Sequence, residues 1–162
     1  MTDLGLLRQF LGLEIEKNGK GIMLSQKKYA LDLMKKFNMA EFRESKSPFL
    51  SGIKMHEFGN SLMVDITLYR QLVGSLLYLI HTRPDLSWLI VVARHMHQPH
   101  EIHWISAKRV LRYVQGTKNF GVHYTASSSL PLARFSYSYW DGDTTNRKST
   151  SSFVFMFVEV HI

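Results

Sequence analysis

The first part of the chain alternates apolar and polar residues with a period of two, which is typical of β-strands. The apolar positions on one face are Leu11, Leu13 and Ile15, and the alternation resumes at Ile22 and Leu24. Asn18-Gly19 lies between these two runs and is a tight-turn signal. The pattern therefore predicts an N-terminal β-hairpin.

A first helix is predicted directly after this hairpin, with Ser25 as its candidate N-cap. Its apolar stripe contains Tyr29, Ala30, Leu33, Met34 and Phe37, and its opposite half is basic because it contains Lys27, Lys28, Lys35 and Lys36. From residue 40 to residue 60 the periodicity is lost among Pro, Ser and Gly, which predicts a long loop.

A second helix is predicted over residues 66–81, with Asp65 as its cap. Apolar residues cover most of its circumference, which indicates burial on more than one side. The remaining stripe is small or polar, and it consists of Thr67, Gln71, Gly74, Ser75 and Tyr78. Either another helix or the backbone of a ligand could approach this stripe closely, and the pattern does not choose between them.

Two more helices and a change of period complete the pattern. The third helix is predicted from Leu86 to Met96, before Pro99, and the fourth covers residues 100–115 and stops at Gly116. Beyond it, residues 120–125, 132–139 and 153–158 follow a period of two and predict three strands. The expected class is α+β.

The charge of the chain makes a polyanionic partner worth testing. The 162 residues include 20 Lys and Arg against 13 Asp and Glu, a formal net charge of +7. Such a balance fits a nucleic-acid partner, and it also fits a solvated basic surface. The fourth helix adds basic residues at Lys108, Arg109 and Arg112.

Composition and motifs exclude several other classes of protein. The absence of Cys excludes disulfides and thiolate zinc sites. No apolar run is long enough for a membrane span. We therefore expect a soluble intracellular protein without a membrane partner. The chain contains neither a nucleophile elbow nor a P-loop.

Two segments could still suggest a metal site. Residues 141–146 resemble the start of a calcium loop, but Asn146 replaces the expected Gly and Ser152 replaces the bidentate Glu. His95, His97, His100 and His103 form the densest imidazole cluster, for which we weigh a structural role against a zinc site. We predict no metal site.

Several blocks, taken in order, resemble the copia-type retrotransposon polyprotein, a family also found as fragments in plant mitochondrial genomes. They cover the C-terminal part of the reverse transcriptase and the start of RNase H. The blocks are residues 1–5 with 10–15, 24–30, 69–76, 82–85, 103–104 with 107–113, and 142–143 with 147–151. The resemblance implies a reverse transcriptase primer-grip and thumb-like region over residues 1–117 and a truncated, antiparallel RNase H-like sheet over 118–162.

Site residues follow from this resemblance. Phe10, Leu11 and Gly12 are similar to the primer grip, and the helix from Tyr69 to Ile80 is similar to the thumb helix beside the primer-template duplex. Gln71, Gly74 and Ser75 would then face an RNA–DNA hybrid or another duplex. The resemblance gives phosphate neutralisation to Arg70, Lys108, Arg109 and Arg112.

The departures from the family indicate a catalytically inactive chain. The polymerase carboxylates of the family precede the block that begins here at Met1, and two RNase H aspartates are replaced by Tyr137 and Tyr139. A neutral phenol cannot hold the magnesium that the family uses, so we expect no cofactor. Nuclear, cytoplasmic and plant mitochondrial locations all stay open.

Three functions remain as hypotheses. The first is a remnant of the retrotransposon polyprotein that binds nucleic acid weakly and without sequence preference. The second is a pseudogene-like remnant with no selected activity. The third is a subunit that acts with a separate chain supplying the missing polymerase core.

Overall fold

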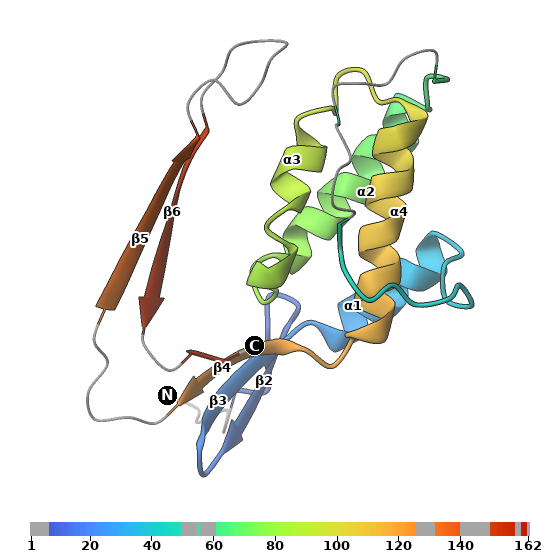
Figure 1. Ribbon diagram of the computed structural model, residues 1–162. Coiled ribbons are helices and arrows are strands. Elements are labelled where there is room, and N and C mark those ends of the chain that lie inside the picture. Colours follow the sequence, from blue (N-terminus) through green and yellow to red (C-terminus); the bar gives the residue numbers. More distant parts are fainter. Residues whose placement is uncertain are drawn as a thin grey trace.

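The structure is a computed structural model that describes residues 7–49, 55, 61–125, 132–139, 150–157 and 160–161. A bundle of helices stands at one end of a twisted antiparallel sheet, and two further strands form a separate ribbon (Figure 1). The α+β class expected from the sequence is therefore confirmed.

The larger sheet has five antiparallel strands in the order β1-β2-β3-β4-β7. Asn18 pairs with Gly21 across the turn between β2 and β3, which confirms the predicted hairpin. The strands are β1 (Gln9–Phe10), β2 (Leu13–Asn18), β3 (Gly21–Ser25), β4 (Gly121–Thr125) and β7 (Val160–His161).

Two local predictions in this region are wrong. Leu11 does not continue the strand alternation, because it lies in a turn between β1 and β2 and its φ is 47°. Ser25 is not the helix N-cap either, since it is the last residue of β3 and pairs with Gly121. Gln26 takes the N-cap position without a side-chain hydrogen bond to the helix.

The strands after the helices do not form the single sheet that the sequence pattern suggested. β4 pairs with β3, whereas β5 (Leu132–Tyr139) pairs with β6 (Thr150–Phe157). Gly121 permits the close approach of β4 to β3, because a Cβ atom at this position would overlap the carbonyl oxygen of Leu24. Whether the ribbon belongs to an RNase H-like domain starting at residue 118 stays a prediction.

The bundle contains four α-helices and a short 3₁₀ helix within the described residues. At the start of α2, Asp65 Oδ1 accepts hydrogen bonds from the N–H groups of Thr67 and Leu68 at 2.7 and 3.1 Å, which confirms the predicted cap. The helices are α1 (Lys27–Lys36), α2 (Ile66–Leu79), η1 (Pro84–Leu86), α3 (Leu89–Ala93) and α4 (Glu101–Gly116).

The third helix is shorter than its apolar run suggested. The N–H groups of Ile90 and Val91 bond to the carbonyl group three residues earlier, and those of residues 94–96 do the same. Such bonds tighten the backbone into a 3₁₀ form, so the α-helical part is limited to Leu89–Ala93.

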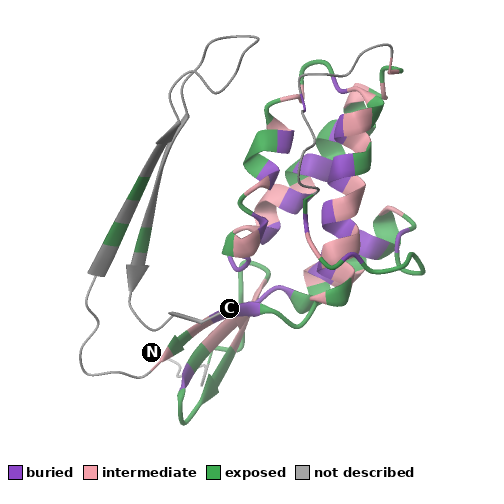
Figure 2. Cartoon of the chain, viewed as in Figure 1, coloured by how far each residue is buried: buried purple, intermediate pink, exposed green. Residues whose placement is uncertain are grey.

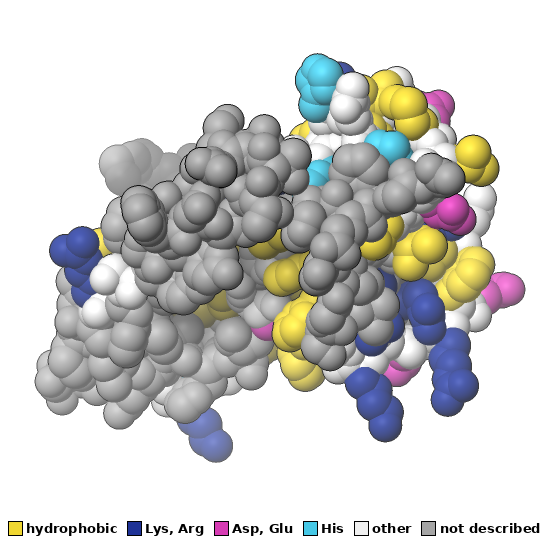
Figure 3. Space-filling model, turned by 45° about the horizontal axis from the view of Figure 1, so that its top comes forward, with side chains coloured by type: hydrophobic (Ala, Val, Ile, Leu, Met, Phe, Trp, Pro, Cys, Tyr) yellow, Lys and Arg dark blue, Asp and Glu magenta, His cyan; other side chains and the backbone are white. Residues whose placement is uncertain are grey.

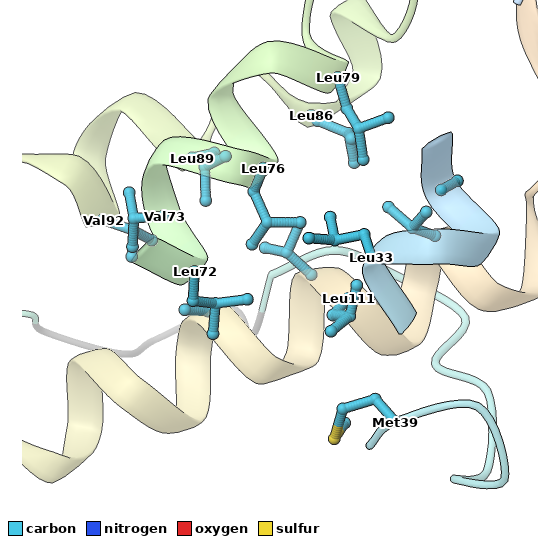
Figure 4. Close-up of a cluster of buried hydrophobic side chains, with 14 of the residues drawn as sticks. Leu33, Met39, Leu72, Val73, Leu76, Leu79, Leu86, Leu89, Val92 and Leu111 are labelled. Carbon is cyan, nitrogen blue, oxygen red and sulfur yellow. The ribbon is translucent and has the colours of Figure 1, made fainter. Parts of the chain in front are cut away.

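The core lies where the four helices face one another, and buried residues gather on those inner faces (Figure 2). Leu72 and Leu76 of α2 and Leu111 of α4 lie in the layer between these two helices, with Leu33 of α1 beside them (Figure 4). No described helix combines the length and the apolar character that crossing a lipid bilayer requires.

Candidate nucleic-acid interface

The primer-grip-like residues Phe10, Leu11 and Gly12 lie at the exposed turn between β1 and β2, which we call the hairpin tip. Leu11 and Gly12 have φ values of 47° and 78°, and this pair of left-handed residues connects Phe10 to Leu13, which are partners in the sheet. Two consecutive left-handed residues are typical of the tight turns that fit the twist of a hairpin. The tip leaves the Phe10 side chain 54% exposed and the Leu11 side chain 77% exposed.

A tyrosine attaches this tip to α2. The Tyr78 hydroxyl donates a hydrogen bond to the carbonyl oxygen of Leu11, 67 residues earlier in the chain. A Cβ atom at Gly12 would lie 2.9 Å from the same hydroxyl oxygen, so glycine permits the close approach. The structure therefore brings the predicted grip and the predicted thumb-like helix together.

A second tyrosine attaches α1 to the same part of α2. The Tyr29 hydroxyl donates to the carbonyl oxygen of Ser75 at 3.1 Å. The Tyr29 and Tyr78 rings meet edge to face, with centroids 4.9 Å apart and planes at 76°. The hairpin tip, α1 and the C-terminal half of α2 thus meet around two phenol rings.

The middle of the stripe on α2, at Gln71 and Gly74, is open among the described residues. Gln71 and Gly74 are exposed, and Ser75 is half-buried. A Cβ atom at Gly74 would meet no described atom within 4 Å. Of the two occupants that the sequence left open, a helix takes only the end of the stripe at Ser75 and Tyr78, where Tyr29 of α1 makes its contacts.

Arg70 lies at the edge of the stripe nearest α3. Its Nε–H donates to the carbonyl oxygen of Met96 at 3.0 Å, and the side chain stays exposed. One edge of its guanidinium is thereby held against the segment after α3. The other predicted cations are placed differently.

The three basic residues of α4 are half-buried on another side of the bundle. Arg109 donates to Ser47 Oγ at 3.4 Å, and Arg112 Nε–H donates to the carbonyl oxygen of Arg43 at 2.7 Å. Lys108 Nζ lies 5.0 Å from the centroid of the Trp104 ring. The two arginines thus fasten the segment around residues 43–47 to α4.

These α4 residues are not brought together with the α2 stripe. The two helices pack through their apolar faces, with Leu72, Leu76 and Leu111 between them (Figure 4). A residue on the opposite face of each helix must therefore point away from the other helix. The cations of α4 and the open stripe of α2 consequently lie on opposite sides of the helical layer.

Arg83, to which the sequence analysis assigned no role, makes several hydrogen bonds through its guanidinium. Arg83, which is 3% exposed, forms two hydrogen bonds to Asp85 at 2.9 and 2.7 Å. It also donates to the carbonyl oxygen and the hydroxyl of Thr117, at 2.8 and 2.7 Å. The Tyr113 and Phe120 rings lie 5.6 and 5.3 Å from the guanidinium carbon. This clamp joins the end of α2 to the end of α4.

The histidine cluster has structural contacts. The His103 side chain is buried, and its Nδ1 accepts a hydrogen bond from the backbone N–H of His100 at 2.9 Å. The ring proton is therefore on Nε2, which donates to the carbonyl oxygen of Met55 at 2.8 Å. Burial, more than the nearby His100, lowers the pKa of His103, and the bond to Met55 partly opposes the shift. His95 stacks on its ring with centroids 4.0 Å apart.

No group of three or more His, Asp or Glu side chains within the described residues is arranged to hold a metal ion. The calcium-like segment at 141–146 lies outside the described residues. On the face shown in Figure 3, the visible histidines gather at one end of the bundle, and most Lys and Arg side chains of the bundle lie towards the other. The basic end is therefore the better candidate for an anionic partner.

Tyr137 and Tyr139, which the resemblance aligned with aspartates of the family, both lie in β5. They pair with Ser152 and Thr150 of β6. The backbone at these positions is thus an ordinary antiparallel ladder.

Comparison with known proteins supports the resemblance seen in the motifs. The chain matches no protein-family model and no solved structure. It is 38% identical over 149 residues to the retrovirus-related Pol polyprotein from transposon RE2 of Arabidopsis thaliana, and this match covers 91% of the chain and 10% of the polyprotein. The similar polyprotein from transposon TNT 1-94 of Nicotiana tabacum is 32% identical over 170 residues, which cover 97% of the chain and 12% of that protein.

A shorter relative is an uncharacterized mitochondrial protein of Arabidopsis thaliana. It is 36% identical over 155 residues, covering 94% of the chain and 64% of that protein. The chain spans only about a tenth of the length of the transposon polyproteins. It is thus a homologue of a segment of the copia-type Pol polyproteins of retrotransposons.

Proposed function

We propose that this chain binds a nucleic-acid duplex, with an RNA–DNA hybrid as the preferred form, and that it catalyses neither polymerisation nor cleavage by itself. The observation that carries the proposal is the bond from Tyr78 to the Leu11 carbonyl, because it joins the exposed hairpin tip to the open stripe of α2. Neither feature alone would form a continuous surface for a duplex.

The stripe has the chemistry that a sugar–phosphate edge requires. Gly74 carries no side chain, so a backbone ribose could come within contact distance of the helix. The exposed Gln71 amide can donate to a phosphate or exchange hydrogen bonds with a 2′-hydroxyl. This 2′-hydroxyl distinguishes RNA from DNA, which favours the hybrid over a DNA duplex.

The hairpin tip offers a different kind of contact. Phe10 and Leu11 are large apolar side chains held in the open at the end of a tight turn. An exposed aromatic ring can stack on an unpaired base or pack against a ribose, independently of base sequence. We assign the tip to the strand end and the stripe to the adjoining duplex.

The non-catalytic half of the proposal rests, as far as RNA cleavage is concerned, on the two tyrosines in β5. Hard divalent cations take oxygen ligands, preferably carboxylates, and a phenol with a pKa near 10 remains protonated at neutral pH. Tyr137 and Tyr139 therefore offer no charged ligand at the positions that match family aspartates. Magnesium-dependent nucleotide incorporation or RNA cleavage by the purified chain would overturn this half.

The binding half is tested by titrating a labelled RNA–DNA hybrid at several salt concentrations. We expect the logarithm of the association constant to fall linearly with the logarithm of the salt concentration. No binding at low salt, or binding that salt does not affect, would refute the proposal. Single-stranded RNA and a DNA duplex of the same sequence serve as comparison ligands.

A substitution series at one position separates binding from folding. Gly74→Ala should stabilise the exposed helix by up to about 1 kcal/mol, while Gly74→Leu adds bulk where the duplex must approach. We expect affinity to fall in the order wild type, Gly74→Ala, Gly74→Leu, although neither variant loses stability relative to wild type. Unchanged affinity in Gly74→Leu would place the duplex elsewhere.

A further inference from the structure

One face of the larger sheet presents apolar and basic side chains to solvent. Residues paired across antiparallel strands point to the same face, and so do residues two apart along a strand. Ile22 and Tyr124, which are partners in β3 and β4, are 40% and 41% exposed. We call this side of the sheet the open face, and its residues are Arg8, Ile15, Lys17, Ile22, Leu24 and Tyr124.

The open face is concave. A hollow of about 1120 Å³ lies over it and is bordered by all six of its residues. Met23 and His123, which alternate with these residues in β3 and β4, do not border the hollow, so it belongs to this side of the sheet. Pockets for drug-sized ligands measure about 300–1,000 Å³, so the hollow suits a segment of a polymer better than a small molecule.

The charge that faces the hollow is positive. Arg8 and Lys17 are exposed, and the exposed Lys28 borders the hollow from the first turn of α1. Glu14 and Glu16 also border it, but they alternate with the open-face residues of β2, so their side chains point to the opposite side of the sheet. The Glu14 carboxylate also accepts a hydrogen bond from the backbone N–H of Lys28 at 2.7 Å.

Aromatic rings extend the open face as far as the hairpin tip. Phe10 is two residues from Arg8 and pairs with Leu13, so it points to the same side of the sheet as Tyr124. Exposed rings on a sheet stack on unpaired bases, and neighbouring cations neutralise the phosphates between those bases. The open face combines both features and is continuous with the tip, which the proposed function assigns to the end of a strand.

We infer that the open face binds a single-stranded extension of the hybrid, which passes from the hairpin tip across the sheet. The inference rests on the proposed function, because the duplex on α2 brings the strand end to the tip. Tyr124 stacks on a base, and Arg8 and Lys17 contact phosphates. A protein surface packed on this face would instead bury both cations against apolar groups, which costs their desolvation.

The test compares a blunt RNA–DNA hybrid with the same hybrid carrying a single-stranded extension of a few nucleotides. The extension should raise the affinity of the wild-type chain. Tyr124→Leu should reduce this gain about fivefold or more, the effect of losing one base stacked on a ring, whereas Tyr124→Phe keeps the ring and the gain. The matched control is His123→Leu, which changes the neighbouring residue of β4 on the opposite side of the sheet and should keep the gain.

Salt dependence tests the cations separately. With the extended hybrid, Lys17→Ala should reduce the slope of log affinity against log salt by about 0.7, the value for one phosphate of a single strand. Lys17→Arg should restore the slope. Lys35→Ala removes an identical charge from an exposed residue of α1 that does not border the hollow, and it should leave the slope unchanged.

Different outcomes separate this inference from the proposed function. If the chain binds neither hybrid, both fall together. If it binds the blunt hybrid but the extension adds no affinity, or Tyr124→Leu and His123→Leu reduce the gain equally, only the inference is overturned. Binding confined to the extended hybrid, with the loss in Tyr124→Leu, would keep the single-strand site and refute the duplex site.

Two further measurements complete the test. A wild-type dimer in light scattering that Ile22→Lys converts into a monomer would place a second copy of the chain on the open face and overturn the inference. Thermal melts by circular dichroism show whether each variant folds. Should Tyr124→Leu fail to fold, the salt slope of Lys17→Ala against that of Lys35→Ala decides the matter.

Discussion

The clamp formed by Arg83 is expected to stabilise the bundle more than any other polar contact among the described residues. Asp85→Ala would remove the carboxylate that accepts two of its hydrogen bonds. The Arg83 side chain is 3% exposed, so it could not regain those bonds from bulk water without opening the structure. The variant therefore leaves a buried charge without its counter-ion.

The magnitude follows from what remains after the substitution. Removing one partner of a buried ion pair typically costs about 3–5 kcal/mol, because the remaining charge is desolvated without compensation. Domains of this kind have total stabilities of about 5–15 kcal/mol, so the loss would be a large share. Arg83 keeps its two bonds to Thr117, which places the expected loss near the lower end of that range.

Urea denaturation followed by far-UV circular dichroism measures this loss. The matched control is the double variant Arg83→Met with Asp85→Leu, which replaces the pair by apolar groups and leaves no buried charge. It should be more stable than Asp85→Ala, although it loses the bonds to Thr117. A loss below about 1 kcal/mol in Asp85→Ala, or additive losses across the pair, would refute the reasoning.

Two further predictions concern the hairpin tip and the histidine cluster. Tyr78→Phe removes the hydrogen bond to the Leu11 carbonyl but keeps the ring beside Tyr29. Amide hydrogen exchange in the hairpin tip should therefore accelerate about fivefold, the equivalent of about 1 kcal/mol, while the urea midpoint changes little. Unchanged exchange would contradict the attachment of the tip to α2. The pKa of His103 in the folded chain is lowered from its ordinary 6.5, so the unfolded chain binds the proton more readily. The free energy of unfolding should therefore be at its full value above about pH 6.5 and fall as the pH drops through the pKa of the folded chain. Urea midpoints at pH 7.5 and 5.0 measure this loss, His103→Asn should reduce it, and a higher midpoint at pH 5.0 would be inconsistent with a buried neutral imidazole.

The sequence predicted those features that depend on neighbouring residues. Asn18-Gly19 sets a tight turn, and Asp65 satisfies the free N–H groups at the start of α2. In both cases the groups that interact are within three residues of each other, so their spacing in the sequence carries the information. The apolar stripe of α1 was equally local, and its buried residues are those expected.

Features that depend on distant residues could not be found in this way. The partner of β4 is β3, which lies nearly a hundred residues earlier in the chain. Gly121 lies in the strand predicted over residues 120–125, and a glycine within a strand can mark the close approach of another backbone. The Arg83 clamp left no periodic signal, because its partners come from two separate turns.

In the candidate interface too, the sequence predicted local features but not the relative placement of distant ones. Periodicity identifies the exposed face of each helix, but it does not say whether the exposed faces of two helices point in the same direction. The resemblance therefore assigned phosphate neutralisation to Arg70, Lys108, Arg109 and Arg112 without telling which of them faces the duplex. Packing of α2 on α4 separates Arg70 from the other three.

The surface proposed for the duplex depends on contacts that contribute little to the core. Tyr29 and Tyr78 are only half-buried, and their hydroxyl groups join three elements that are otherwise placed by separate interactions. The core of α1, α2 and α4 is formed by leucine and valine side chains that do not involve the hairpin tip. Loss of these two hydroxyls should therefore separate the tip from the stripe without unfolding the bundle. Because the duplex must touch both, its affinity should respond to the tyrosines more strongly than the stability of the chain does.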